Sequence, residues 1–309
     1  MAILVFSNKD DIAIELLSKG LELGKALGME VVAITMSGDA QALADRGVKV
    51  YKGQSEALSS CDAAVCAEAL EQLAKKAGAK ILLIGSNRRG KEVGTRLAQK
   101  LGAGCVTDVS SIEVQDGKLV CSRNAFGGAT IAVQSIASDI QVICANPRTF
   151  EPAPAVGGGS VEEVALSLKA PRTRVVEVQD KNTGSADIEG AEVLVCVGKG
   201  LSKQEDLKMV EELATAVGGM VACSKPIATD EKWMSEDLII GLSGKKGKPQ
   251  LAICLGISGQ VQFTVGIRDA KTIVAVNNDQ NAYIFQMADY GIVGDIYDVV
   301  PKLAAALKK

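Results

Sequence analysis

Short apolar runs alternate along the chain with stretches in which apolar residues recur every three or four positions. The longer period predicts amphipathic helices, and the short runs predict buried strands. Gly28 follows the first helical stretch and is the residue type that commonly ends a helix. Strands and helices in this alternating order are typical of a parallel sheet covered by helices, which predicts an α/β fold. The strands expected in the first half span residues 2–6, 31–35, 48–51 and 81–84.

The pattern changes from about residue 105, where the apolar runs become short and rich in β-branched residues. Turn residues such as Asp116 and Gly117 separate them. Short strands joined by tight turns are typical of antiparallel pairing, so we expect antiparallel strands added to the parallel core. These strands span residues 111–114, 119–122, 130–133 and 140–145.

A break in the pattern divides the chain of 309 residues, which is long enough for two domains. Residues 147–159 contain three prolines, and residues 180–185 are polar. We therefore expect an N-terminal nucleotide-binding-like α/β domain over residues 1–185 and a second domain over residues 186–309. The second is expected to be Rossmann-like and doubly wound, with strands over 193–197, 220–223, 238–242, 251–255 and 272–276.

Composition narrows the classes of function. Basic residues number 34 against 37 acidic residues, a net charge of −3, and aromatic residues make up 3%. Such a chain lacks the positive field and the stacking platforms that hold nucleic acid. Its apolar stretches are shorter than the roughly 18 residues of a membrane span, and its N-terminus lacks the basic segment of a signal peptide. We expect a cytoplasmic protein that binds no nucleic acid and inserts into no membrane.

The chain contains no histidine. This excludes a Ser-His-Asp or Cys-His mechanism and any His-ligated zinc or haem site. The eight cysteines form no Cys-x-x-Cys pair, and most lie in apolar runs. They are expected to be small buried thiols of a reducing compartment, so neither a metal site nor a catalytic side chain is predicted.

Three strand-to-loop junctions of the second domain are rich in glycine and hydroxyl residues. Loops of this kind at the ends of neighbouring parallel strands meet in the crevice where α/β sheets bind ligands, and their N–H groups suit phosphates. Taken singly, each is also an ordinary turn between a strand and a helix. Together they predict a nucleotide-cofactor site whose chemistry comes from the cofactor, because no base or nucleophile accompanies them. The junctions are Gly198-Lys199-Gly200, Gly241-Leu242-Ser243 and Gly256-Ile257-Ser258-Gly259.

Longer motifs run from Ser224-Lys225 through Gly256–Gln262 and Ala275–Asp279 to Ile284–Asp295. They resemble the alpha subunit of electron-transfer flavoproteins. The element Glu231-Lys232-Trp233-Met234 is similar to the Fix-type branch of that family. The resemblance implies a second domain that binds FAD, a heterodimer with a beta subunit, and electron transfer involving a dehydrogenase or a reductase.

The resemblance also implies roles for single residues. Lys199 corresponds to a basic residue near the flavin pyrophosphate. Ser224 and Lys225 correspond to a Ser-Arg pair beside the isoalloxazine ring. Gly241, Leu242 and Ser243 correspond to the loop whose hydroxyl contacts flavin N5. The other implied contacts are the cradle Gly256, Ile257, Ser258, Gly259, Gln260, Val261, Gln262 and Phe263, and the adenosine end Asn277, Asp279 and Asp295.

Three of these positions depart from the familiar members of the family. Lys225 stands in place of arginine, which keeps the charge and loses the planar fork of donors. Leu242 stands in place of glutamine, and Phe263 in place of a histidine that donates to the pyrimidine carbonyl of the flavin. A reduced flavin would therefore meet one hydrogen-bond donor fewer.

Other interpretations stay open from the residues alone. An adenine-nucleotide-binding regulatory module would carry a nucleotide and no visible colour. A stand-alone NAD-linked dehydrogenase fits less well, because Gly198-x-Gly200 lacks the third glycine of the dinucleotide fingerprint. In the first domain, Arg88, Arg89 and Lys91 are expected either as a solvated helix start or as contacts to an anion or partner.

Overall fold

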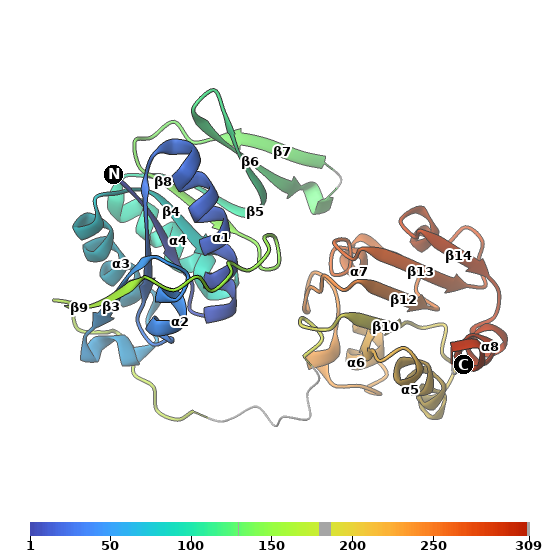
Figure 1. Ribbon diagram of the computed structural model, residues 1–309. Coiled ribbons are helices and arrows are strands. Elements are labelled where there is room, and N and C mark those ends of the chain that lie inside the picture. The colour runs from blue at the N-terminus through green and yellow to red at the C-terminus, as the bar shows by residue number, and fades with distance from the viewer. Residues whose placement is uncertain (129, 179–186, 308–309) are drawn as a thin grey trace. The chain divides into compact units, whose positions relative to one another are not determined.

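The computed structural model describes residues 1–128, 130–178 and 187–307. It divides the chain into two compact units, Met1–Val178 and Gln179–Lys309 (Figure 1). The boundary expected near residue 185 lies outside the described residues, so it stays a prediction. Each unit is described by itself.

A nine-stranded sheet forms the centre of the first unit, in the order β7-β6-β5-β8-β4-β1-β2-β3-β9. In this order, all neighbouring strands between β5 and β9 are parallel to each other. β6 and β7 extend the sheet in antiparallel fashion from β5. The strands are β1 (Ala2–Phe6), β2 (Glu30–Thr35), β3 (Lys49–Gln54), β4 (Ala79–Gly85), β5 (Gly104–Gln115), β6 (Lys118–Ala125), β7 (Thr130–Ser135), β8 (Gln141–Ala145) and β9 (Ser160–Ala165).

Helices cover both faces of the parallel part of this sheet (Figure 1). Ile3 and Val5 of β1 belong to the core layer under α1 and α2, whereas Leu4 and Phe6 belong to the layer under α3 and α4. Because successive side chains of a strand point to opposite faces, a strand between two helix layers needs an unbroken apolar run. The helices are α1 (Asp10–Leu27), α2 (Ala40–Ala44), α3 (Ala63–Ala77) and α4 (Arg88–Leu101), with the 3-10 turns η1 (Glu56–Ser60) and η2 (Phe126–Gly128).

The antiparallel addition expected in this unit is confirmed for β5, β6 and β7. The strand expected at 140–145 is wrong in direction, because β8 lies parallel between β4 and β5. The sequence pattern does not predict β9, which pairs in parallel with β3. Most side chains of this edge strand are exposed, so it carries no apolar run that could signal it.

All five strands of the second unit are parallel and follow the order β11-β10-β12-β13-β14. α5 and α8 pack on the face that carries Val195 and Val197, while α7 and η5 pack on the face of Leu194 and Cys196. The expected doubly wound, Rossmann-like domain is confirmed. Its elements are β10 (Val193–Val197), η3 (Gln204–Asp206), α5 (Leu207–Ala216), β11 (Met220–Cys223), α6 (Lys225–Thr229), η4 (Glu236–Leu238), β12 (Leu251–Leu255), α7 (Val261–Thr264), β13 (Thr272–Asn277), η5 (Tyr283–Gln286), β14 (Tyr290–Val293) and α8 (Ile296–Leu307).

The strand expected at 238–242 is wrong. The segment begins in the 3-10 turn η4, and only single bridges follow, at Ile239 and Ile240. The chain then bends at Gly241, whose φ of 136° lies in the region that favours glycine. A bend at this point leaves the segment too short for a strand ladder.

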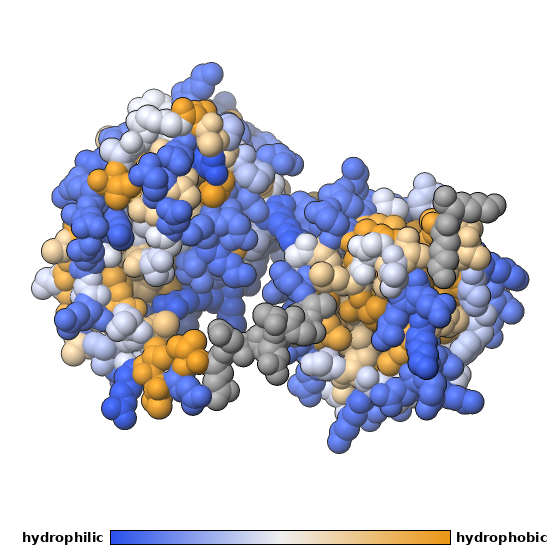
Figure 2. All heavy atoms as spheres, turned by 60° about the horizontal axis from the view of Figure 1, so that its bottom comes forward, coloured by the Kyte–Doolittle hydropathy of each residue, from blue (hydrophilic) through white to orange (hydrophobic). Residues whose placement is uncertain are grey.

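Polar side chains cover much of the face drawn in Figure 2, and apolar side chains gather in separate patches. On the antiparallel extension of the first unit, Phe126, Ile131 and Val133 are 88%, 68% and 65% exposed. These three residues give the extension an uncovered apolar surface. No described helix is long and apolar enough to cross a membrane.

Candidate functional site

The topology of the second sheet creates a crevice above β10 and β12. From β10 the chain passes to β11 on one side, whereas β12 lies on the other side of β10. The segments that leave β10 and β12 turn to opposite faces, since α5 belongs to one core layer and α7 to the other. Open parallel sheets bind ligands at such a switch point, outside the carboxyl ends of the strands.

Glycine backbones from the two loops touch in this crevice. The Gly200 N–H donates to the Gly256 carbonyl at 3.0 Å, and the Gly198 N–H donates to the Leu255 carbonyl at 2.9 Å. A Cβ atom on Gly200 would lie 2.5 Å from the Cα of Gly256, closer than real Cβ atoms come. The floor of the crevice is therefore bare backbone, which a phosphate group can approach closely.

The loop after β12 is fixed by a second backbone contact. The Ile284 N–H donates to the Ser258 carbonyl at 3.1 Å. Gly259 has a φ of 86°, and a Cβ there would collide with the Ile284 backbone. The Ser258 side chain is exposed beside it. Helix α7 has only 4 residues, so backbone N–H groups and not a helix dipole give this loop its capacity for an anion.

A third loop is bonded to the same segment. The Leu242 N–H donates to the Gln262 carbonyl at 2.7 Å, and Gly241 lies against that carbonyl. The Leu242 side chain is 66% exposed, and Ser243 is exposed as well. The structure thus joins the loop expected at flavin N5 to the loop expected to cradle the cofactor.

The loop after β11 reaches the same edge of the sheet. The Ser224 N–H donates to the Val197 carbonyl at 2.9 Å, directly before Gly198. Lys225 is exposed, and among the described residues its ammonium group has no ion-pair partner. Burial raises the pKa of the neighbouring Cys223 thiol to about 12, so this thiol is neutral at physiological pH. Lys225 is therefore an uncompensated positive charge at this end of the crevice.

Asn277, Asp279 and Asp295 shape the opposite end. The buried Asn277 amide donates to the Ile257 carbonyl at 2.9 Å, and its oxygen accepts from the Asp279 N–H at 2.9 Å. The Asp295 carboxylate accepts from the Tyr297 N–H at 2.9 Å, where α8 begins. These side chains fix the conformation of their loops, and their contact with a ligand stays a prediction.

Two other residues that are expected to contact the flavin, Lys199 and Phe263, interact with other parts of the protein. The Lys199 ammonium forms an ion pair with Glu231 at 3.1 Å. Phe263 is only 7% exposed and belongs to the apolar layer that also contains Ile267 and Ile284. Phe263 therefore packs beneath the cradle loop, while Lys199 is a surface cation whose charge Glu231 partly offsets.

The sequence does not single out Tyr297, which connects two sides of the site. Its hydroxyl donates to the Asp206 carboxylate at 2.6 Å and accepts from the Ser202 N–H at 2.8 Å. These contacts tie the start of α8 to the segment that follows Gly200. The partners lie 91 and 95 residues away along the chain, so no local motif signals them.

Comparison with known proteins gives two family matches. Residues 8–169 match the family described as "Electron transfer flavoprotein domain", and residues 187–268 match "Electron transfer flavoprotein FAD-binding domain". The "Putative electron transfer flavoprotein subunit YdiR" of Escherichia coli (strain K12) is 38% identical over 287 residues, covering 91% of each chain. "Protein FixB" of Salmonella typhimurium is 35% identical over 308 residues, covering 99% of this chain and 97% of the relative. None of these matches describes an adenine-nucleotide-binding regulatory module.

Proposed function

This chain belongs to the electron transfer flavoprotein family, and we propose that it holds FAD in the crevice above β10 and β12 as the alpha subunit of a heterodimer. Membership of the family makes it an electron-transfer flavoprotein with a flavin-binding second unit. We propose the identity of the flavin as FAD, the residues that contact it, and a beta subunit as the partner.

The observation that carries the proposal is the backbone contact between Gly200 and Gly256. It removes side chains from the point where the loops after β10 and β12 meet, so a diphosphate can lie against N–H groups. Asn277, bonded to Ile257, limits the crevice on the side of β13. Ser224 and Lys225 limit it on the side of β11. The residues present therefore fit an elongated dinucleotide such as FAD.

When bound, the flavin supplies the redox chemistry, and the chain supplies position and charge. We assign the diphosphate to the loop Gly256–Gln262 and to Lys199, which would exchange part of its pairing with Glu231. We assign the isoalloxazine ring to the end of the crevice formed by Lys225 and Gly241–Ser243. The exposed Leu242 side chain can cover the ring there, and the Ser243 hydroxyl can donate to it.

Lys225 is the residue through which the chain acts on the redox potential. A flavin gains negative charge as it is reduced, and a fixed cation in a water-poor site favours that change. Phe263 is buried and donates no hydrogen bond. The ammonium group of Lys225 would then supply a positive charge near the ring.

We assign the contact with a beta subunit to the first unit. Three large apolar side chains, Phe126, Ile131 and Val133, are exposed on its antiparallel extension. Exposed apolar clusters of this kind mark surfaces that another protein covers. The heterodimer would pass electrons from a dehydrogenase or an NADH-linked donor to a reductase, a quinone oxidoreductase or a ferredoxin-type acceptor.

Co-expression with a beta-type subunit tests the proposal. The purified complex is expected to be yellow, to sediment as a heterodimer, and to release FAD on denaturation, identified by chromatography against authentic FAD and FMN. Titration with a chemical reductant is expected to bleach the bound flavin. A complex that carries an adenine nucleotide and no flavin would contradict the proposal.

A further inference from the structure

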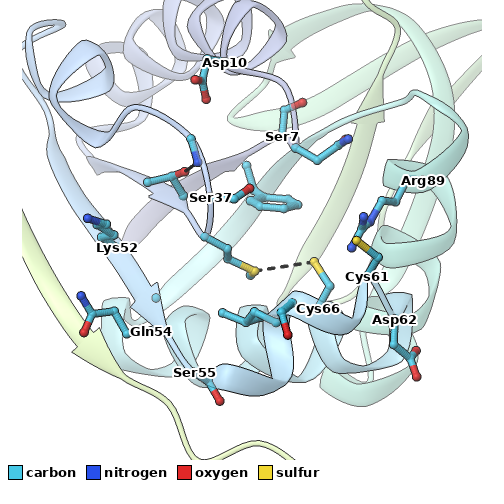
Figure 3. Close-up of a pocket in the computed structure, with 18 residues that line it drawn as sticks. Ser7, Asp10, Ser37, Lys52, Gln54, Ser55, Cys61, Asp62, Cys66 and Arg89 are labelled. Carbon is cyan, nitrogen blue, oxygen red and sulfur yellow. Dashed lines mark hydrogen bonds between the residues drawn. The ribbon is translucent and has the colours of Figure 1, made fainter. Parts of the chain in front are cut away.

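A cavity lies in the first unit, whereas the loops assigned to the flavin belong to the second unit. It has a volume of about 550 Å³ and opens at the carboxyl ends of β1, β2 and β3 (Figure 3). Phe6, Met36 and Leu58 give it apolar walls. Its polar lining includes Ser7, Asp10, Thr35, Lys52, Asp62 and Arg89.

Most of these polar groups already have partners within the protein. The Ser7 hydroxyl oxygen accepts from the Lys9 N–H at 3.1 Å, and the Thr35 hydroxyl oxygen accepts from the Gly38 N–H at 2.8 Å. Asp10 accepts from a backbone N–H at 3.0 Å, and Lys52 forms an ion pair at 3.3 Å. The Arg89 guanidinium and the side chains of Ser37, Gln54 and Ser55 have no hydrogen-bond or ion-pair partner among the described residues. The lining also contains three sulfur atoms, those of Met36, Cys61 and Cys66.

The sulfur atoms are the distinctive feature of this cavity. The Cys66 Sγ and the Met36 Sδ lie 3.7 Å apart, and Cys61 lines the same cavity (Figure 3). Cys61 is the exposed one of the eight cysteines, contrary to the expectation of buried thiols. It follows the 3-10 turn η1 with a positive φ of 55°, and its neighbour Asp62 caps α3. The turn and the cap place both thiols at one wall.

The distance between the Cys66 Sγ and the Met36 Sδ suits two ligands of one metal ion. A metal–sulfur bond of about 2.3 Å, the length found for zinc thiolates, places two ligands roughly 3.8 to 4.0 Å apart at tetrahedral or trigonal angles. Among the described residues, no group of three or more imidazole, carboxylate or thiol side chains is placed to hold a metal. A site here must therefore include the thioether of Met36.

We propose that Cys66, Met36 and Cys61 form a binding site for a soft monovalent cation, Cu(I), in the first unit. Thiolate and thioether ligands select Cu(I) over harder divalent ions, and Cu(I) accepts two or three ligands. One Cu(I) displaces the two thiol protons to solvent, and no electron is exchanged in that step.

The charge of the cavity supports a thiolate site. Two thiolates and one Cu(I) leave a single negative charge, and Arg89 lines the same cavity without an ion-pair partner among the described residues. Arg89 is thus placed to offset the charge of the filled site.

Competition for Cu(I) tests the proposal on the reduced, full-length chain under anaerobic conditions, with bicinchoninate as the coloured competitor. The wild-type chain is expected to withdraw one Cu(I) per molecule and to show sulfur ligands only by X-ray absorption at the copper edge. Met36→Leu conserves volume and removes the ligand, so affinity should fall at least tenfold. Cys66→Ser should do the same, with folding checked by circular dichroism.

A matched control is Cys105→Ser, which removes a half-buried thiol of the first unit that does not line the cavity. This variant is expected to bind Cu(I) like the wild type. Failure of the wild-type chain to withdraw Cu(I), or a loss caused by Cys105→Ser and not by Met36→Leu, would overturn the assignment. Flavin content is not a readout here, so the result is independent of the proposed function.

Discussion

Gly200 and Gly256 are in direct backbone contact, joined by a hydrogen bond of 3.0 Å from the Gly200 N–H to the Gly256 carbonyl. The two residues belong to loops that leave β10 and β12 toward opposite faces of the sheet. A Cβ on either residue would fall within 2.6 Å of backbone atoms of the other. The shape of the proposed flavin site depends on this pair.

Gly200→Ala should weaken flavin binding by at least about fivefold. The added methyl must push the two loops apart, since Gly256 backbone atoms leave no space for it, and overpacking of this kind costs about 1–3 kcal/mol. Flavin occupancy of the purified heterodimer, measured by absorbance after denaturation, reports the effect. The control is Gly247→Ala, where the nearest atom is the end of the Leu194 side chain at 3.0 Å. Equal occupancy in both variants would refute the role of the contact.

Ser258→Ala should reduce flavin affinity by about fivefold. The exposed hydroxyl makes no hydrogen bond with any described residue, so its loss leaves the loop intact and removes one donor to the diphosphate, worth about 1 kcal/mol. Gly259→Val is a poorer test of the same loop, because its side chain would strike the Ile284 backbone and distort the fold itself. Isothermal titration of the flavin-free complex with FAD measures the affinity. An unchanged dissociation constant would place the diphosphate elsewhere.

Lys225→Met should lower the reduction potential of the flavin. The substitution keeps the length of the side chain and removes a positive charge that has no ion-pair partner among the described residues. A loss of about 1.4 kcal/mol corresponds to roughly 60 mV for one electron. Spectroelectrochemical titration of the heterodimer measures the shift, with Lys208→Met on α5 as the control. If both variants keep the wild-type potential, Lys225 does not face the ring.

Tyr297→Phe should destabilise the second unit by about 1–2 kcal/mol. The lost hydroxyl bonds to the Asp206 carboxylate at 2.6 Å and to the Ser202 N–H at 2.8 Å, and hydrogen bonds to charged groups are the stronger kind. Urea unfolding monitored by circular dichroism gives the free energy of unfolding. Tyr290→Phe is the matched control, because Tyr290 is 67% exposed and its hydroxyl has no partner among the described residues. The two variants should differ, and identical stabilities would contradict this reading.

The sequence predicts the parallel part of both sheets well, because buried parallel strands carry unbroken apolar runs. β1 and β10 are buried along most of their length and lie within the predicted ranges. β9 is rich in polar, exposed residues, so no apolar run indicates it. β14 has a short apolar sequence, Tyr290–Val293, but its side chains are exposed and the sequence pattern does not predict it as a strand. The predicted strand at 238–242 fails for a different reason: its apolar run is real, but the bend at Gly241 ends it.

The position of the proposed flavin site can be predicted in part from the glycines in the sequence. Gly198, Gly200 and Gly256 stand out because few turns need so many glycines, and the structure brings them together. The contact of Tyr297 with Asp206 is not predictable, because it depends on how α8 packs beside α5. The closeness of Met36 to Cys66 likewise arises from the packing of β2 against α3, which no local pattern encodes.

Hydrogen–deuterium exchange of the heterodimer with and without FAD tests whether the flavin lies above β10 and β12, because it reports on each loop separately. We expect slower exchange on FAD binding in the peptides that contain residues 198–200, 241–243 and 256–262. Peptides that line the cavity at β1, β2 and β3 should exchange at the same rate in both states. Protection confined to that first-unit cavity, with no change in the three loops, would contradict the claim that the flavin lies above β10 and β12.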